Sequence, residues 1–539
     1  MSRVSLLVSV SLLSAACSGG SHAVSPEPDG GDTDSDTGFD NDAGPDSGAG
    51  GWRMSWAVRA GSDHDEVLET SGDLKARDDG FVLVPGIFDE GADFGEGQPG
   101  EVIPAHYGFL DGFVAGYDVD GTLELLRTVG GMDQDTYQSL AFLPDGGFVA
   151  TGGICALNDV YVDTGIEEPE HEVVTTPDDY GVVLVRYDEQ GRLMWIRPAL
   201  YSEYSVGVRV VLLETGVILV SGDFLGELTL GSSEEDSLSL DAGESYDAFV
   251  AAYSQDGDLM WAQDTAVSQG ESGTAMGAIL VGIPGGGFLI SGEYAGDVVM
   301  GKGQSNETVL QGGIYDYRHY IARFSDGGEL AWAFDVGGDE MGMGSAIAVM
   351  PDGDGFAVGG SFKGTLALGE GQANEEIFEA ITDGRYDAFI ARYTMDGELT
   401  WARRIGGGSP STASNYANSV ADATALADRG LVVCGIAAKG AVFGEGEPTE
   451  TQIDATSAAY VAVYGSKGDF EWVQTMGRTD PENMCKGVDA LGDSTIFATG
   501  KFSGEDVPFG TYQGDMTYLT SKGNEDIFVL RMDRVQSGP

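Results

Sequence analysis

Basic residues are scarce in this sequence. Only 27 Lys and Arg stand against 88 Asp and Glu in 539 residues, and the formal net charge is −61. Because phosphate contacts need clustered Lys and Arg, this balance argues against a nucleic-acid partner. A chain with 42% apolar residues is nevertheless too hydrophobic to be wholly disordered. The composition therefore predicts a folded and strongly acidic protein.

Long hydrophobic runs and familiar catalytic motifs are also scarce. No stretch beyond the N-terminal segment reaches the roughly 18 apolar residues of a membrane-spanning helix. The sequence contains no GxSxG, HExxH or phosphate-loop motif. Its five His, at 23, 64, 106, 171 and 319, occupy unrelated positions without metal-ligand spacing, so we interpret them as ordinary surface or loop residues. Carboxylates are too numerous for one acid/base pair to stand out. We therefore predict no catalytic residue.

The N-terminal segment has the pattern of an export signal. In residues 1–16, Arg3 precedes a short apolar run that cannot span a bilayer. The sequence Leu-Ser-Ala-Ala-Cys at 13–17 resembles the lipobox of bacterial lipoproteins, which implies cleavage before Cys17 and lipidation of its thiol. Ser18 then implies the outer membrane, at either its periplasmic or its surface side. The alternative is an ordinary secretory signal with a chance cysteine.

The next segment predicts a disordered tether. Residues 17–51 consist mainly of Ser, Gly, Pro and Asp, and they contain eight acids and no Lys or Arg. Such a segment cannot bury enough apolar surface to offset the entropy that ordering would cost. We expect it to link the lipid anchor to the folded body.

The body is built from an internal repeat. In each unit an alternating apolar strand ends in Tyr or Phe, a turn glycine follows, and a second strand is centred on an aligned position that is usually Trp. The turn glycines are Gly121, Gly191, Gly257, Gly328, Gly397 and Gly468, at spacings of 70, 66, 71, 69 and 71 residues. The aligned positions are Trp56, Leu125, Trp195, Trp261, Trp332, Trp401 and Trp472. We interpret both sets as structural: the glycines form hairpin turns, and the Trp side chains pack adjacent sheets.

Asp-Gly and Gly-Gly turns between apolar runs predict an antiparallel meander of four strands per unit, here called A to D. A four-stranded unit repeated in this way is typical of a propeller blade. The ordered sequence begins with an isolated D strand and finishes with a C strand, so the two ends complete one blade. The prediction is an all-β, seven-bladed propeller over residues 52–535, with blade seven built from 480–532 plus 52–60, and a tail at 536–539.

The motif Asp-x-Phe-Val-Ala-x-Tyr-x-x-Asp-Gly-x-Leu-x-Trp, followed by Gly-Gly, resembles the SBBP-type propeller repeats of bacterial cell-surface lipoproteins. The resemblance extends from Trp52 to Arg534 and implies a secreted seven-bladed scaffold without established catalytic residues. The sequence departs from the motif at Leu125, Gly181, Arg318, Ala437 and Ala458.

The connections between strands supply the candidate ligand face. The long B–C and the D–A connections lie at one end of a meander, whereas the A–B and C–D turns are tight and lie at the other. The D–A connections are acidic and predict a ring of oxygens that suits calcium. The acids are Asp63, Asp65, Asp133, Asp135, Glu203, Glu271, Asp339, Glu340, Asp480 and Glu482. The alternative is that they cap turns by accepting hydrogen bonds from backbone N–H groups.

Three cysteines follow Cys17, and an odd number outside the cytoplasm leaves at least one thiol unpaired. Cys434 and Cys485 are predicted to approach each other, either as a disulfide or as two buried thiols, and Cys155 lies elsewhere in the repeat.

Two functions remain in view. The first is a monomeric, lipid-anchored, non-enzymatic scaffold of the bacterial cell envelope that binds a protein or glycan. The alternative is a calcium-dependent glycan hydrolase or lyase that uses the mouth of the channel. An enzyme should break the repeat with a local cluster of unique residues, whereas the sequence shows only diffuse variation, greatest between Cys155 and Tyr180.

Overall fold

A computed structural model describes most of the chain beyond residue 50. The described residues are 51–62, 69–70, 72–155, 159–163, 171–174, 180–231, 233–268, 273–313, 317–338, 340–341, 346–380, 386–407, 418–454, 457–477, 483–510, 516–523 and 525–535. The predicted signal segment, Cys17 and nearly all of the predicted tether lie outside these ranges. Within them, no helix is long and apolar enough to cross a membrane.

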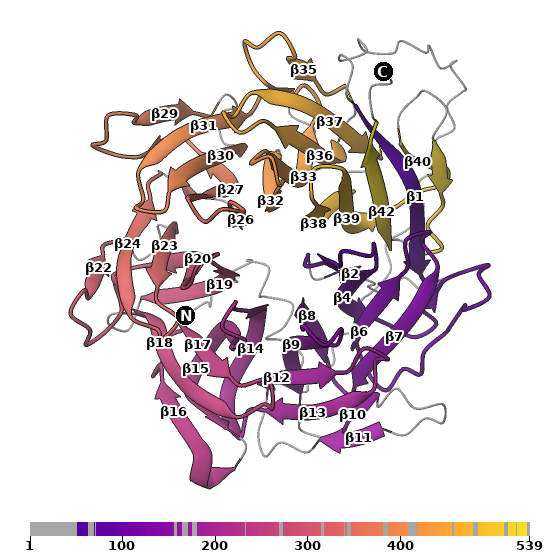
Figure 1. The fold of residues 1–539 in the computed structure, drawn as a ribbon, viewed down its shortest axis with the longest axis vertical. Coiled ribbons are helices and arrows are strands. Elements are labelled where there is room, and N and C mark those ends of the chain that lie inside the picture. The colour runs from indigo at the N-terminus through magenta and orange to yellow at the C-terminus, as the bar shows by residue number, and fades with distance from the viewer. Residues whose placement is uncertain are drawn as a thin grey trace, which may run out of the picture.

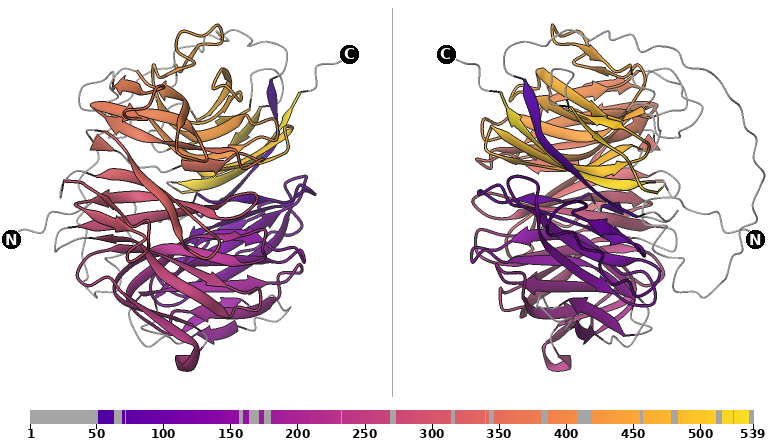
Figure 2. Two further views of the ribbon diagram at one scale, coloured as in Figure 1. Left: turned by 60° about the vertical axis from the view of Figure 1, so that its left-hand side comes forward. Right: turned by 90° about the vertical axis from the view of Figure 1, so that its right-hand side faces the viewer.

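The described residues form antiparallel sheets that stand around a central axis, so the fold is an all-β propeller (Figure 1). Side views show the same sheets stacked around the ring, with the indigo first strand among the yellow last strands (Figure 2).

The sheet that joins the two ends of the chain, here called the closing sheet, has the order β38 (Met484–Leu491), β39 (Thr495–Phe502), β42 (Asp526–Arg534), β1 (Trp52–Gly61) and β5 (Asp93–Phe94). The next sheet contains β2 (Glu69–Thr70), β4 (Val82–Phe88), β6 (Asp111–Tyr117), β7 (Leu123–Gly130), β10 (Val160–Asp163) and β11 (His171–Val174), with β3 (Lys75–Ala76) also paired to β4. It is followed by a sheet of β8 (Thr136–Phe142), β9 (Phe148–Cys155), β12 (Tyr180–Tyr187) and β13 (Leu193–Pro198).

Further round the ring, one sheet contains β14 (Tyr201–Leu212), β15 (Ile218–Gly231), β17 (Asp247–Tyr253), β18 (Leu259–Ser268), β21 (Val298–Met300) and β22 (Thr308–Leu310). A short 3-10 turn, η1 (Glu234–Asp236), precedes β16 (Ser237–Asp241), which pairs with β15. The next sheet contains β19 (Thr274–Gly282), β20 (Phe288–Ala295), β23 (Arg318–Phe324) and β24 (Leu330–Val336).

The remaining ring sheets contain β25 (Glu340–Met341), β26 (Ala346–Val349), β27 (Gly355–Lys363), β30 (Asp387–Thr394) and β31 (Leu399–Ile405), then β32 (Asn418–Ala425), β33 (Leu431–Ala438), β36 (Ser457–Tyr464) and β37 (Phe470–Met476). Small two-stranded sheets pair β28 (Thr365–Leu368) with β29 (Glu376–Glu379), β34 (Val442–Phe443) with β35 (Thr451–Gln452), and β40 (Val507–Phe509) with β41 (Thr517–Leu519).

The middle strands of each sheet are buried on both faces. All residues of β6, β9 and β17 are buried, although alternate side chains point to opposite faces of a sheet. Neighbouring sheets cover both faces, so the apolar clusters lie between sheets: one of them joins Leu219 and Val250 to Phe288 and Ile290 of the following sheet. Fully burying an aliphatic side chain contributes roughly 1.5–3 kcal/mol, so each sheet depends on its neighbours.

The closing sheet pairs the first strand with the last. In β1 and β42 the antiparallel register runs from Trp52 opposite Arg534 to Ala60 opposite Ile527. The pairing predicted from the incomplete terminal units is therefore confirmed. Because β42 also pairs with β39, a strand from each end of the chain completes one sheet.

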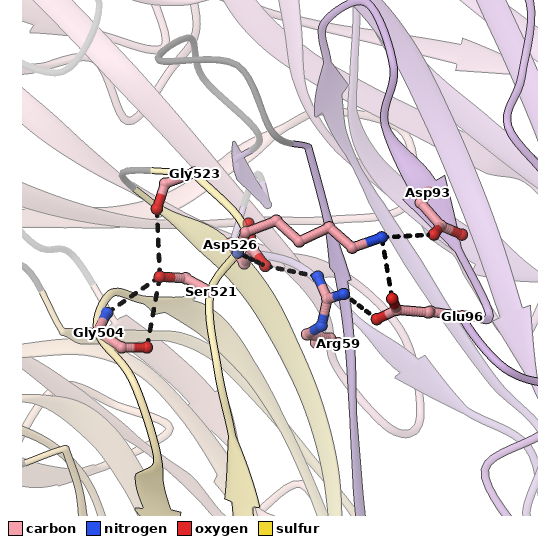
Figure 3. A network of polar contacts seen from close by, with 8 residues as sticks. Arg59, Asp93, Glu96, Gly504, Ser521, Gly523 and Asp526 are labelled. Atoms are coloured by element: carbon pink, nitrogen blue, oxygen red, sulfur yellow. Dashed lines mark hydrogen bonds and ion pairs between the residues drawn. The ribbon is translucent and has the colours of Figure 1, made fainter.

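Ion pairs reinforce this closure (Figure 3). Arg59 in β1 donates to Asp526 in β42 at 2.7 Å and also contacts Glu96. Lys522 lies 2.8 Å from Asp93 and 3.0 Å from Glu96, both in the segment around β5. The network joins the N-terminal strand, the C-terminal strand and the next unit of the repeat.

The aligned Trp positions contact the next unit of the ring. The indole N–H groups of Trp56, Trp195, Trp332 and Trp401 each donate to a carbonyl in the C–D turn of the following unit, at 2.8–3.3 Å. The turn glycine lies against the ring: a Cβ on Gly121 would lie 2.9 Å from Trp56, and a Cβ on Gly257 would lie 3.0 Å from Trp195. These contacts are those of packing residues.

Several long B–C connections form straps across the outer rim, which the sequence analysis missed. Strand β5 pairs with β1, and β21 pairs with β18, so each connection extends the preceding sheet. The turn that follows then bonds its own sheet: Gln98 accepts from Leu123 N at 2.8 Å and donates to Gly121 O at 3.0 Å. Gln304 and Gln372 repeat both contacts. Much of the loop length predicted for ligand display thus holds neighbouring sheets together.

The Trp contact predicts that alanine destabilises the protein more at a turn glycine packed against a Trp ring than at a turn glycine in open space. Gly468 has φ +80°, and a Cβ there would lie 2.7 Å from the ring of Trp401; Gly446 has φ +79°, with nothing within 4 Å. Both Gly468→Ala and Gly446→Ala introduce backbone strain of about 1–2 kcal/mol, but only Gly468→Ala meets a packed ring. Chemical denaturation should show Gly468→Ala to be the less stable by about 1–3 kcal/mol. Equal stabilities would contradict the packing role of Trp401.

Candidate functional site

The predicted acidic ring is only partly within the described residues. Asp63, Asp65, Glu271, Asp339, Asp480 and Glu482 lie outside them, and of Glu340 only the backbone in β25 is described. Glu203 is exposed on β14, with its carboxylate against Gly226. Asp133 is half-buried and Asp135 is fully buried before β8. No group of three or more His, Cys, Asp or Glu in the described part of the chain is arranged to hold a metal, so the ring stays a prediction.

Asp135 has a neighbour that the sequence analysis did not single out. A parallel bridge between Leu110 and Gln134 places Asp111, the leading Asp of its repeat, beside Asp135. Each carboxylate accepts one backbone hydrogen bond, Asp111 from Tyr107 N at 2.8 Å and Asp135 from Cys155 N at 2.9 Å. Segments 24 residues apart in sequence (111 to 135) thus bring two acids together.

Burial controls the protonation of this pair. It raises the pKa of Asp111 to about 7, against the opposing hydrogen bond from Tyr107. It also raises the pKa of Asp135 well above its usual range, and repulsion from Asp111 adds to the effect, although the hydrogen bond from Cys155 N and the nearby N–H of Gly131 oppose it. Both changes follow because a buried carboxylate loses the solvation of its charged form.

A second polar group lies on the innermost strands. Asp73 accepts from Lys75 Nζ at 2.7 Å, from Ser139 Oγ at 2.7 Å and from Leu140 N at 3.2 Å. Since Ser139 and Leu140 belong to β8 of the next sheet, the carboxylate links two neighbouring sheets on the inner side of the ring (Figure 1).

Similar bonds continue in both directions. Ser139 Oγ accepts from Val210 N of β14 at 3.0 Å. On the other side of Asp73, Asp489 accepts from Ala76 N at 2.9 Å, and Asp422 accepts from Val488 N at 2.9 Å. A side-chain oxygen of one inner strand thus repeatedly binds the backbone edge of the next.

The polar side chains that link the inner strands are here called the inner belt and comprise Asp73, Lys75, Ser139, Arg209, Asp422 and Asp489. Their opposite charges compensate one another. Burial would raise the pKa of Asp73, but Lys75 and Arg209 hold it below its ordinary value. Asp422 lies within electrostatic reach of Arg209 and Lys75, yet burial dominates and raises its pKa to about 6. The sequence could have indicated this group, because Lys75 and Arg209 are two of its few basic residues and lie in predicted A strands. The repeat markers did not highlight them.

Another buried pair joins Glu293 of β20 to His319 of β23, with Oε1 and Nε2 3.8 Å apart. Burial raises the pKa of Glu293 to about 7. His319 was interpreted as an ordinary surface or loop residue; that prediction is wrong, because β23 places its ring between sheets at 4% exposure.

Cys434 of β33 and Cys485 of β38 are buried free thiols in one apolar cluster. Burial raises the pKa of Cys434 well above its ordinary value, and the adjacent Cys485 adds to the effect. The predicted approach of the two cysteines is confirmed, and of the two alternatives the structure has the pair of thiols.

The fold and this arrangement define the chain as a β-propeller whose inner strands are joined by polar side chains and whose sheets bury several acidic groups. No protein-family model matches the sequence, and the curated proteins give no match.

Among solved structures, the chain is similar to the Dos1 propeller, with 9% identity, a TM-score of 0.35, and 89% of this chain and 95% of that chain covered. It is also similar to Sqt1 from Chaetomium thermophilum, with 11% identity, a TM-score of 0.36, and 84% and 97% covered. A third similar structure is the calcium-binding protein regucalcin from Agrobacterium tumefaciens, with 10% identity, a TM-score of 0.27, and 67% and 81% covered.

The raised carboxyl pKa values predict an unusual dependence of stability on pH. Asp422 near 6 and both Asp111 and Glu293 near 7 bind protons more tightly in the folded than in the unfolded state. Their stabilising contribution is therefore fully present below about pH 4, and it is lost as pH rises through 6 to 7. The melting temperature should rise by several degrees between pH 8 and pH 5.5.

The Glu293→Gln variant should show a smaller pH slope than the wild type, because it removes one of the titrating groups. The slope should also survive 0.5 M salt, which screens the repulsion among exposed acids. A melting temperature that is flat or falls from pH 8 to pH 5.5 would contradict the folded-state pKa values.

Proposed function

We propose that this protein is a lipid-anchored, non-enzymatic binding scaffold of the bacterial cell envelope, similar to the SBBP-type propeller lipoproteins. In this proposal every ring sheet of four or more strands is one blade, which gives a seven-bladed ring closed by the shared sheet. The straps, the aligned Trp contacts and the inner belt support it, because they make a rigid ring on which the remaining loops are presented.

The observation that carries the proposal is an exposed apolar patch, here called the rim patch. It consists of Phe109, Met132 and Val173, which are 53%, 66% and 48% exposed, beside Tyr107 and Tyr161. Gly108 packs against Met132, the rings of Tyr107 and Tyr161 stack at 4.7 Å, and Val173 lies opposite Tyr161 in β10–β11. These contacts bring the three segments that carry the patch side by side.

The chemistry of the rim patch favours a protein partner. Asp133, Asp159, Asp163 and Glu172 lie beside it in the sequence, whereas residues 155–180 contain no Lys or Arg and residues 101–135 contain only Arg127. An apolar centre with an acidic rim complements a partner surface that has an apolar anchor and a basic rim. The patch lies where the B–C connections and the D–A connection after β7 meet, which is the predicted ligand face.

Two variants test the rim patch. Phe109→Ser combined with Met132→Ser should reduce recovery of a specific envelope protein at least tenfold when the full-length, detergent-purified chain is used as bait, because central apolar contacts dominate binding. Val309→Ser combined with Ile377→Ser is the matched control, since these side chains are also exposed, at 52% and 57%, but lie on β22 and β29.

Equal recovery with both double variants would contradict a binding role for the rim patch. Cleavage of a glycan that depends on added calcium would instead favour the alternative, a glycan-active enzyme.

The lipid anchor has its own test. Cys17→Ser removes the thiol that lipidation requires, so the protein should move from the membrane fraction to the soluble fraction. Metabolic labelling with a fatty-acid analogue should label the wild type and leave Cys17→Ser unlabelled. Unchanged fractionation and labelling would contradict the anchor.

A further inference from the structure

The buried pair Asp111 and Asp135 lacks the ion pair that compensates the charge of several other buried carboxylates. Asp73 lies 2.7 Å from Lys75, Asp526 lies 2.7 Å from Arg59, and Asp93 lies 2.8 Å from Lys522. Asp111 and Asp135 are both 0% exposed, yet neither forms an ion pair with a Lys or Arg among the described residues. Two adjacent buried acids need a counter-charge or a proton.

In each of the two acids, one carboxylate oxygen accepts a hydrogen bond and the other does not. Tyr107 N and Cys155 N occupy Asp111 Oδ2 and Asp135 Oδ1. Asp111 Oδ1 and Asp135 Oδ2 are buried and have no hydrogen-bond partner in the described part of the chain. An unsatisfied buried acceptor is costly, and in native proteins it points to a group that completes it.

The backbone carbonyl of Asp159 lies close to the unpartnered oxygen of Asp135. The position that a Cβ on Gly131 would take lies 3.2 Å from Asp135 Oδ2 and 3.3 Å from the carbonyl oxygen of Asp159. At the preceding residue, a Cβ on Gly130 would lie 2.4 Å from Asp111 Oδ1. Gly130 therefore lets the Asp111 carboxylate lie directly against the chain, and Gly131 leaves a space that Asp135 Oδ2 and the carbonyl oxygen of Asp159 face and that a side chain would fill.

A neutral oxygen donor completes the surroundings. Tyr180 is 3% exposed, and its hydroxyl lies beside the side chain of Thr136. This hydroxyl would lie 2.5 Å from a Cβ on Gly153, in the strand whose Cys155 N binds Asp135. The hydroxyl of Tyr180 also interacts electrostatically with the carboxylate of Asp135.

We infer that Asp111, Asp135 and the carbonyl of Asp159 form a binding site for one hard divalent cation of the calcium class at the Gly130–Gly131 turn. Carboxylate and carbonyl oxygens are the ligands that calcium prefers, and water supplies the remaining positions of its coordination shell. The ion would neutralise the buried pair and fix the β7–β8 connection to the strand β10. The inference does not depend on the rim patch, although Met132 follows directly in the chain.

The test is calorimetric titration of the full-length chain with calcium chloride after chelation, in 0.15 M potassium chloride to screen the acidic surface. The wild type should show one saturable site with a Kd of about 10⁻⁴ M, the range of extracellular calcium modules. Asp135→Asn keeps the hydrogen-bond acceptor for Cys155 N and removes the charge, so it should weaken this site at least tenfold. Gly131→Ala keeps both acids but fills the space, and it should weaken the site similarly.

Asp264→Asn is the matched control, because Asp264 in β18 is another largely buried carboxylate with an unpartnered oxygen. It should leave the affinity within twofold of the wild type. Thermal melts provide a second measurement that separates loss of the site from misfolding. Without calcium, Asp135→Asn should melt at or above the wild-type temperature, because it removes a buried repulsion. With 5 mM calcium, only proteins with the site intact should gain several degrees.

The absence of a saturable site up to 5 mM calcium would overturn the inference and leave a protonated acid pair. Retention of the site in Asp135→Asn would place calcium elsewhere and would equally overturn it. Binding of magnesium with higher affinity than calcium would contradict the assignment to the calcium class.

Discussion

The whole ring depends on burial between neighbouring sheets. A sheet whose middle strands are apolar on both faces has no stable isolated state, since each face must be covered by another sheet. The pairing of β1 with β42 satisfies this need where the chain begins and ends its circuit. Arg59 and Lys522 tie that seam with ion pairs to Asp526 and Asp93, so the closing sheet is held both by apolar packing and by charge.

The repeat motif describes contacts between units more than it describes single units. Four of the aligned Trp side chains donate hydrogen bonds to the next C–D turn. The turn glycines Gly121, Gly257 and Gly468 lie against a Trp ring, where a Cβ would collide. The straps add hydrogen bonds from Gln98, Gln304 and Gln372 to the same turns. Residues that recur in every unit therefore stabilise the ring, and functional residues belong among those that do not recur.

The net charge of −61 has two different structural meanings. Many acids are exposed and solvated, whereas a smaller set is buried in the inner belt, the closing sheet and the Asp111–Asp135 pair. The buried acids of the inner belt and of the closing sheet form ion pairs with the scarce basic residues, notably Lys75, Arg59 and Lys522. The Asp111–Asp135 pair lacks such a partner in the described residues and lies next to the rim patch in the chain, which makes this junction of two sheets the most informative region for function.

The sequence by itself determined the strands, the hairpin turns, the aligned Trp positions and the complementary terminal strands, because these depend on local turn geometry and on a repeat that can be counted. It also indicated that Cys434 and Cys485 approach each other. Only the tertiary structure placed Asp111 beside Asp135, linked Asp73 to β8 and buried His319 between sheets. These contacts are set by the register between separated segments and by the packing of adjacent sheets, and neither leaves a mark on the periodicity of a single strand.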